Sequence, residues 1–168
     1  PKGNILCGKI RPGHFDGVLK VVYKLFYLTK PDLSVFGIKD FQQLYLIKQM
    51  AKKHFPKLKI LSAPTIRNKN GLALSSRNSY LDKKLINIAP LFYKILLDGI
   101  KNLKNSNNVE ETIKDITKTL EKNKFLVNYV SFLTTELEKL NANSSEKKIL
   151  LSSVELGQTR LIDNIEFS

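Results

Sequence analysis

The residues best suited to chemistry lie in one short stretch, residues 71–78, with the sequence Gly-Leu-Ala-Leu-Ser-Ser-Arg-Asn. Gly71 permits a backbone turn that other residues resist. Ser75 and Ser76 supply hydroxyl donors, and Arg77 supplies a planar, permanently charged fork that suits phosphate oxygens. The stretch matches no established phosphate-binding motif, so an ordinary surface turn also explains it. On these residues alone, a phosphate-handling loop and a surface turn both stay open.

A second candidate lies between an expected strand and an expected helix, at residues 36–43, Phe-Gly-Ile-Lys-Asp-Phe-Gln-Gln. In open α/β sheets, ligands bind beyond the carboxyl ends of the strands, and helix N-termini favour anions. Lys39 is placed to offer a point charge there. Asp40 and Gln43, three residues apart, also fit a helix-capping arrangement, but that interpretation leaves Lys39 unexplained.

The two histidines give weaker signals. His14 lies in a loop rich in proline and glycine, residues 11–17, and three roles stay open for it: substrate contact, general base or ordinary loop residue. His54 ends a lysine-rich helix and is expected at the surface. No carboxylate or cysteine pattern accompanies them, so the sequence favours neither a zinc site nor a Ser/His/Asp hydrolase.

The chain has 168 residues with 28 basic and 15 acidic side chains, a net charge of +13. Such a charge raises nucleic acid as a partner. The lysines, however, are scattered along the chain, and no aromatic-studded basic patch or nucleic-acid motif is found, which disfavours specific binding to DNA or RNA. Arginine occurs only at Arg11, Arg67, Arg77 and Arg160. Retained arginines in a lysine-rich chain suggest a need for bidentate geometry, and two of them flank the loop at 71–78.

Cysteine usage and hydropathy bear on location. Cys7 is the single cysteine, so no disulfide can form within the chain, and a reducing compartment fits. No apolar run approaches the roughly 20 residues that span a membrane. No signal peptide opens the chain. We therefore expect a cytoplasmic protein without a membrane partner.

The periodicity of the first 63 residues predicts alternating helices and strands. The expected elements are a helix capped by Asp16, a strand over residues 33–36, a helix after Asp40 and a strand over residues 58–63. Helix and strand alternating through short links is typical of a parallel α/β sheet.

The pattern changes after about Pro64. The expected elements are a long helix over residues 82–103 capped by Asp82, a polar loop at 105–108, a helix around 109–120, and strands over 126–133, 148–154 and 160–162. Pro90 should kink the long helix or mark a join between two helices. Helices followed by strands indicate a small α+β domain over residues 64–168.

Four motifs occur in order along the chain: residues 11–18 (Arg-Pro-Gly-His-Phe-Asp-Gly-Val), the stretches at 36–43 and 71–78, and residues 160–164 (Arg-Leu-Ile-Asp-Asn). Together they resemble the pantoate–β-alanine ligase family over nearly the whole chain. The four motifs with their spacing are specific, whereas any one of them alone is not.

The resemblance implies a fold and a reaction. The fold would be the C-terminal part of a Rossmann-like, nucleotidyltransferase-type sheet in residues 1–63, followed by an α+β lid domain in residues 64–168. The carboxylate of pantoate would attack the α-phosphate of ATP to give pantoyl adenylate and pyrophosphate. The amine of β-alanine would then displace AMP, giving pantothenate for the coenzyme A pathway. Mg²⁺ and fixed cations would offset charge on the phosphates.

The resemblance also assigns roles by position. The residues that would line the ATP site are Gly37, Ile38, Lys39, Asp40, Ile66, Leu74, Ser75, Ser76 and Arg77. Those that would act in catalysis are Lys39, Ser75, Ser76 and Arg77. Gln43 would bind pantoate, with Arg11 and His14 near the pantoate and β-alanine pocket. No protein ligand to a metal is expected. Because the loop follows the change of pattern near Pro64, closure of the lid should carry it towards Lys39.

Two departures from the family pattern matter. Ile38 stands where the family usually has glutamate, so only backbone contacts are expected there. The family's His-x-Gly-His motif is absent, and with it the first strands of the sheet. We therefore expect this chain to be the C-terminal part of the enzyme and to make no pantothenate by itself. The complete enzyme is expected to be a homodimer.

Two rival functions stay open at this point. Another adenylate-forming enzyme of the nucleotidyltransferase superfamily would use Lys39 and the Ser-Ser-Arg loop equally well, and Gln43 and His14 would distinguish it. A basic nucleic-acid-binding module would instead use the lysine-rich surface and bind with a steep dependence on salt.

Overall fold

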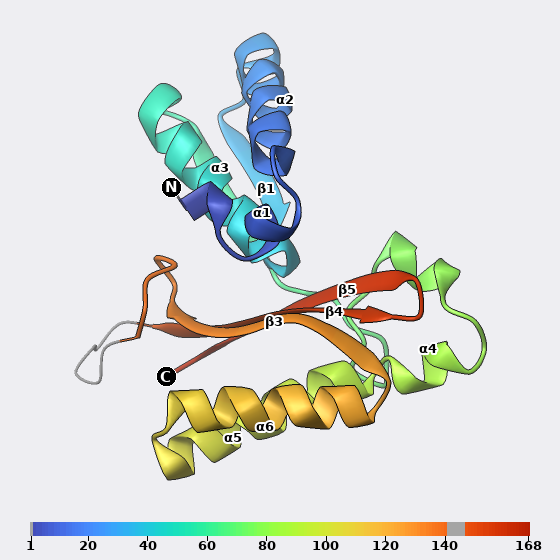
Figure 1. Cartoon of the computed structure of the whole chain (residues 1–168). Coiled ribbons are helices and arrows are strands. Elements are labelled where there is room, and N and C mark those ends of the chain that lie inside the picture. The colour runs from blue at the N-terminus through green and yellow to red at the C-terminus, as the bar shows by residue number, and fades with distance from the viewer. Residues whose placement is uncertain (1, 141–146) are drawn as a thin grey trace. The chain divides into compact units, whose positions relative to one another are not determined.

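The computed structural model describes residues 2–140 and 147–168. The chain divides into two compact units, Pro1–Thr65 and Ile66–Ser168 (Figure 1). The fold is mixed α/β, with a parallel sheet and helices in the first unit and a separate small sheet in the second, as the sequence predicts. In the part that the structure describes, no helix combines the length and apolar character needed to cross a membrane.

The first unit is built around a pair of parallel strands. Its elements are η1 (Lys2–Asn4), α1 (Cys7–Ile10), α2 (His14–Thr29), β1 (Leu33–Gly37), η2 (Ile38–Asp40), α3 (Phe41–His54) and β2 (Lys59–Ala63). The register of β1 and β2 runs from Leu33 opposite Lys59 to Gly37 opposite Ala63. The predicted parallel pairing of the two strands is therefore confirmed.

Helices α2 and α3 supply the core of this unit. Phe26, Ile47 and Ala51 are buried, and Phe26 meets Phe36 of β1 edge-to-face, with ring centroids 6.2 Å apart. Leu33, Val35 and Leu61, which alternate with the core-facing residues of β1 and β2, stay about half exposed. Parallel sheets are normally covered on both faces, so this apolar face is unusual for a folded protein.

The start of α2 differs from the expectation. The helix begins at His14 and its N-cap is Gly13, with φ of 76°, so Asp16 lies inside the first turn and is not the cap. An acidic residue there still favours the helix because it faces the positive end of the helix dipole. His14 consequently belongs to the helix and not to the preceding loop.

The second unit is an antiparallel sheet with helices on one face (Figure 1). Its elements are η3 (Ser76–Tyr80), α4 (Leu85–Ile88), α5 (Leu91–Ser106), α6 (Val109–Lys122), β3 (Phe125–Thr134), β4 (Lys148–Leu156) and β5 (Thr159–Phe167). The strand order is β3-β4-β5. The core lies between sheet and helices and includes Phe92, Leu96, Leu120, Leu150 and Val154, all of which are almost completely buried.

The structure around Pro90 matches one of the two predicted alternatives. The stretch 82–103 holds two helices, α4 and α5, with Pro90 at the join, because proline cannot donate the hydrogen bond that a continuous helix needs. Asp82 does act as a capping side chain, since its Oδ1 accepts from the backbone N–H of Lys84 at 2.8 Å and of Leu85 at 2.7 Å, but the helix that it caps is the short α4.

The last strand is also longer than predicted. β5 continues to Phe167, whereas the sequence pattern suggests an end at Ile162. The residues that follow, Asp163 and Asn164, are polar and look like loop residues, yet both are buried. The burial of Asp163 is explained by Arg67, a partner 96 residues away in the sequence.

Candidate functional site

In the first unit, the candidate residues lie at the carboxyl end of β1. Gly37 ends the strand, and Lys39 follows in η2, half-buried, directly before the first turn of α3. Gly37 has an ordinary extended conformation, with φ of −70°. A Cβ built on it would meet no heavy atom within 4 Å. Neither the backbone nor the packing of the described residues therefore requires glycine at this position.

The capping interpretation of Asp40 and Gln43 is wrong. Asp40 does stand at the N-cap position of α3, but its side chain makes no capping hydrogen bond. Its φ of −92° and ψ of 59° do not match the extended conformation typical of an N-cap residue. Gln43 lies half-buried in the first turn of α3. Helix capping thus does not explain the Asp-Phe-Gln-Gln segment.

The neighbouring Gln42 has a structural role that sequence reasoning missed. Its Nε2 donates to the carbonyls of Lys2 at 2.9 Å and Ile5 at 2.8 Å, and its Oε1 accepts from the backbone N–H of Cys7 at 3.1 Å. The side chain therefore holds the N-terminal segment against α3. Of the two adjacent glutamines, one is committed to the fold and the other, Gln43, is partly accessible.

Arg11 and His14 contact each other. An Arg11 Nη1 lies 2.8 Å from His14 Nε2, and both side chains are half-buried. Since arginine can only donate, the Nε2 of His14 must accept and carry no proton in this arrangement. The structure brings these two predicted substrate residues together in one hydrogen-bonded pair at the start of α2.

In the second unit, the predicted ATP loop directly follows a short hairpin, residues 66–74. Arg67 and Ala73 form an antiparallel bridge, and the N–H of Leu74 donates to the carbonyl of Ile66 at 2.8 Å. Gly71 turns the chain with φ of 93°, which confirms the turn expected of it. Ile66 and Leu74 are 63% and 53% exposed, whereas Ala73 is 4% exposed. Two apolar side chains of the hairpin that are predicted to bind nucleotide, Ile66 and Leu74, are therefore accessible.

The loop that follows the hairpin is held by local hydrogen bonds. Ser75 Oγ accepts from the backbone N–H of Arg77 at 3.2 Å, which begins η3. Asn78 Nδ2 donates to the carbonyl of Ala73 at 3.0 Å. Asn78 Oδ1 is buried and has no hydrogen-bond partner among the described residues. Ser76 and Arg77 are exposed, so two members of the predicted triplet face outwards between two fixed points of the backbone.

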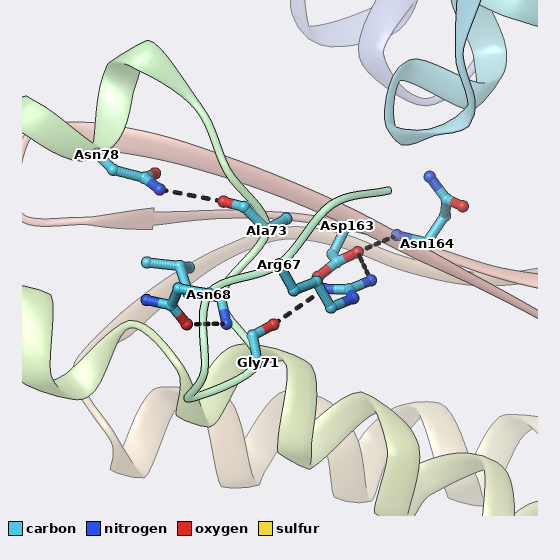
Figure 2. A network of polar contacts seen from close by, with 8 residues as sticks. Arg67, Asn68, Gly71, Ala73, Asn78, Asp163 and Asn164 are labelled. Carbon is cyan, nitrogen blue, oxygen red and sulfur yellow. Dashed lines mark hydrogen bonds and ion pairs between the residues drawn. The ribbon is translucent and has the colours of Figure 1, made fainter. Parts of the chain in front are cut away.

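The hairpin is clamped to the sheet by Arg67. Its Nη1 and Nη2 donate to the two carboxylate oxygens of Asp163 on β5, at 2.6 Å and 2.7 Å (Figure 2). Nη1 also donates to the carbonyl of Gly71 at 3.1 Å, and the guanidinium carbon lies 3.5 Å from the centre of the Tyr93 ring on α5. Asp163 accepts one further bond, from the backbone N–H of Asn164 at 2.8 Å. This cluster makes use of two polar residues of the 160–164 motif.

The charge state of Arg67 bears on how this ion pair depends on pH. Burial by itself lowers the pKa of Arg67, but the hydrogen bond and negative charge of Asp163, together with Tyr93, outweigh burial, so the pKa is raised above its ordinary value. A raised pKa means that the stabilising contribution of the charged guanidinium is complete below the ordinary value and is lost only at still higher pH. The Arg67 charge therefore does not titrate under assay conditions.

The candidate residues thus fall into two sets, one in each unit. Lys39, Gln43, Arg11 and His14 lie in the first, and the hairpin with Ser75, Ser76 and Arg77 lies in the second. The approach of Lys39 to the loop stays a prediction. Within residues 2–140 and 147–168, no group of three or more His, Cys, Asp or Glu side chains is arranged to hold a metal ion. His54 is exposed and meets Tyr23 edge-to-face, as expected of a surface residue.

Comparison with known sequences gives one consistent family. A family model for pantoate-beta-alanine ligase matches residues 1–166. The pantothenate synthetase of Acinetobacter baumannii strain AYE is 40% identical over 162 residues, which cover 96% of this chain and 57% of the relative. That of Buchnera aphidicola subsp. Acyrthosiphon pisum strain 5A is 45% identical over 162 residues, covering 95% and 57%.

Comparison with solved structures agrees. The pantothenate synthetase of Thermus thermophilus has a TM-score of 0.88 and 31% identity, covering 98% of this chain and 60% of that one. The pantoate-beta-alanine ligase of Francisella tularensis, solved with beta-gamma ATP and beta-alanine, has a TM-score of 0.73 and 38% identity, covering 98% and 54%. The chain therefore spans little more than half the length of the relatives that it matches.

Proposed function

The chain belongs to the pantoate-beta-alanine ligase family, and from this we propose that it forms part of a ligase that joins pantoate to β-alanine at the expense of ATP. The observation that carries the proposal is the likeness to the Francisella ligase, which spans 98% of this chain and was solved with beta-gamma ATP and beta-alanine. The mixed α/β fold and the two sets of candidate residues support the same assignment.

The proposed reaction has two steps. A carboxylate oxygen of pantoate attacks the α-phosphorus of ATP, the bond to the bridging oxygen breaks, and pyrophosphate leaves. The neutral amine of β-alanine then attacks the acyl carbon of the adenylate, an amide bond forms, AMP leaves with the electron pair of the broken C–O bond, and the nitrogen releases a proton to solvent. Adenylation is needed because a free carboxylate is a poor electrophile and offers no good leaving group.

Fixed positive charge and hydroxyl donors would stabilise the first step. Lys39, Ser75, Ser76 and Arg77 are the residues that we assign to the phosphates, because groups preorganised where negative charge develops lower the barrier. Mg²⁺ would neutralise further phosphate charge; such an ion usually binds through substrate phosphates and one or two carboxylates.

The remaining assignments follow the geometry of each unit. The open space at Gly37 suits close approach of a nucleotide to the backbone of Ile38, Lys39 and Asp40. The exposed side chains of Ile66 and Leu74 suit contact with an apolar ring face such as adenine. In this proposal, residues 1–63 belong to the ATP and pantoate domain, and residues 64–168 form the lid that brings the loop to Lys39.

Gln43, Arg11 and His14 are assigned to pantoate and β-alanine. Gln43 is the accessible member of the glutamine pair, and its amide can both donate to and accept from a hydroxy acid. The Arg11–His14 pair offers a charged donor next to a polar ring. Homodimerisation of the complete enzyme and a cytoplasmic location stay predictions.

We also propose that this 168-residue chain makes no pantothenate by itself. It spans 57% of the length of the curated relatives. The half-exposed Leu33, Val35 and Leu61 on the uncovered face of the parallel sheet support a requirement for further polypeptide.

A chimaera tests both claims. This chain would be joined to the part of the Buchnera relative that it does not cover, and AMP and pantothenate would be measured with ATP, pantoate and β-alanine. We expect turnover by the chimaera, none by the chain alone, and none by the chimaera carrying Arg77→Ala. A folded chimaera that makes no AMP contradicts the ligase assignment, and steady AMP production by the chain alone contradicts its inactivity.

A further inference from the structure

Arg67 makes more contacts than a simple ion pair requires. Arg67 and Asp163 are 96 residues apart in sequence, and their side chains are 18% and 3% exposed. The same guanidinium makes both carboxylate bonds, donates to the carbonyl of Gly71 and stacks on Tyr93. Only arginine can do all of this, because lysine has neither the fork nor the flat face.

These contacts lock the hairpin at its turn as well as at its base. The carbonyl of Gly71 is tied to the guanidinium, and the ring of Tyr93 lies under the turn: a Cβ at Gly71 would be 3.1 Å from its Cδ1. Across the bridge from Arg67, Ala73 is buried and accepts from Asn78. The backbone is thus fixed immediately before and after Ser75, Ser76 and Arg77.

We propose that Arg67 and Asp163 are positioning residues for the Ser75-Ser76-Arg77 loop, a role that rests on the proposed function. In this proposal they act through the loop and not by touching the substrate. Their role is to fix the hairpin against β5. The loop then leaves Ala73 in a single fixed direction, and its hydroxyls and guanidinium take a single position relative to the phosphates. Tyr93 supports the arrangement by holding the guanidinium plane. A misplacement of about 1 Å at such a loop can lower a rate by roughly a hundredfold.

A purely structural role would predict the same loss of stability, so the test must separate stability from position. Removing one partner leaves a buried charge unpaired and destabilises the fold, whereas replacing both partners by uncharged groups of similar size is often neutral. The informative variant is therefore the double substitution Arg67→Met with Asp163→Asn. Its control is Asp98→Asn, which breaks the exposed Asp98–Lys101 pair on α5, in the same unit.

Amide hydrogen exchange of the chain is the readout, and it needs no nucleotide. The reporters are the N–H groups of Asn68, Leu74 and Asn78, which donate to Leu72, Ile66 and Ser75. The reference is Val154 in the central strand β4. We expect the double variant to exchange at least about tenfold faster at the reporters and unchanged at the reference, because local opening moves only the local amides. The control should change neither.

Two outcomes overturn the proposal. One is native exchange at the reporters in the folded double variant, and the other is acceleration of reporters and reference by the same factor, which is loss of stability alone. If the double variant does not fold, Arg67→Lys replaces it: the charge stays but the fork is lost, and the reporters should still exchange several-fold faster than the reference. Unchanged reporters in Arg67→Lys overturn the proposal as well. Because exchange is measured without ATP, these results are separate from the outcome of the chimaera assay.

In the active chimaera, the positioning role makes a further prediction. The double variant should lose at least about tenfold in kcat at a melting temperature close to that of the parent, whereas Asp98→Asn should keep the parental kcat. An unchanged kcat in the double variant contradicts the positioning role and leaves the ligase assignment intact.

Discussion

Gly99 of α5 lies so close to Ile116 of α6 that a side chain at position 99 would force Ile116 to move. A Cβ built on Gly99 would be 2.4 Å from Cδ1 and 2.5 Å from Cγ1 of Ile116, closer than such atoms can approach. Both residues are buried in the core of the second unit. The glycine thus sets the distance between the two helices that cover the sheet.

Gly99→Ala should therefore destabilise the chain although alanine is the better helix former. We expect a loss of about 1 to 3 kcal/mol, because overpacking outweighs the gain in helix propensity. Urea unfolding followed by circular dichroism measures it. The double substitution with Ile116→Ala should cost less than the sum of the single changes, since it vacates the space that the new methyl needs. Additive losses would show that the two side chains are not in conflict.

The adjacent glutamines should behave differently. Gln42→Ala removes three hydrogen bonds to the N-terminal segment and should cost about 2 to 4 kcal/mol, with faster exchange at the Cys7 amide. Gln43→Ala, the matched control, should change the unfolding free energy by less than about 0.5 kcal/mol. In the chimaera, Gln43→Ala should instead raise the KM for pantoate. Equal losses of stability in the two variants would contradict this division of roles.

Glycine-to-alanine changes at positions 71 and 17 should have opposite effects on the free energy of unfolding. Gly71 has φ of 93° and faces the Tyr93 ring, so Gly71→Ala should destabilise by about 1 to 3 kcal/mol. Gly17 is exposed inside α2, and a Cβ added there would have nothing within 4 Å, so Gly17→Ala should stabilise by about 0.5 to 1 kcal/mol. Thermal unfolding compares the two, and stabilisation by Gly71→Ala would exclude the strained turn.

Arg77→Lys should affect chemistry more than binding. Lysine keeps the charge but loses the fork, so in the active chimaera we expect adenylation to slow by about tenfold or more. The Kd for ATP should change by less than about threefold, because the charge that attracts the phosphates is retained. Pyrophosphate release in a single turnover and equilibrium titration with ATP give the two values. Equal losses in rate and affinity would contradict a role specific to the transition state.

Much of the fold can be predicted from local spacing. The helix containing Leu44 and Ile47, the helix around Ile116 and the strand at 58–63 all occur close to the predicted residues. In each of them the apolar residues repeat with the period of the element, so burial of one face is visible in the sequence. The parallel pairing of the first two strands follows from the single α-helix, α3, that connects them.

Two features were missed because a residue's partner is distant in the sequence. The sequence pattern suggests that β5 ends before Asp163, because no local signal shows that Arg67 neutralises this carboxylate from 96 residues away. Nor can the sequence tell which of Gln42 and Gln43 is buried. The partners of Gln42 are backbone groups, which carry no residue signature.

Only part of the candidate site could be predicted from residue types and spacing. Residue types and spacing indicate Lys39 and the Ser-Ser-Arg loop, while the substrate roles of Gln43, Arg11 and His14 come from the family resemblance and stay predictions. The retention of Arg67 in a lysine-rich chain is the one signal that could have indicated the clamp. Its partner lies in the 160–164 motif, which sequence reasoning connects with the family but with no contact.

The long sequence separation of Arg67 and Asp163 has a consequence for biosynthesis. A ribosome makes the hairpin well before β5, so the newly made hairpin lacks its ion pair with Asp163 until the last strand of the sheet has been translated and paired with β4. A nascent chain would therefore acquire the complete clamp on the hairpin only at the end of its synthesis.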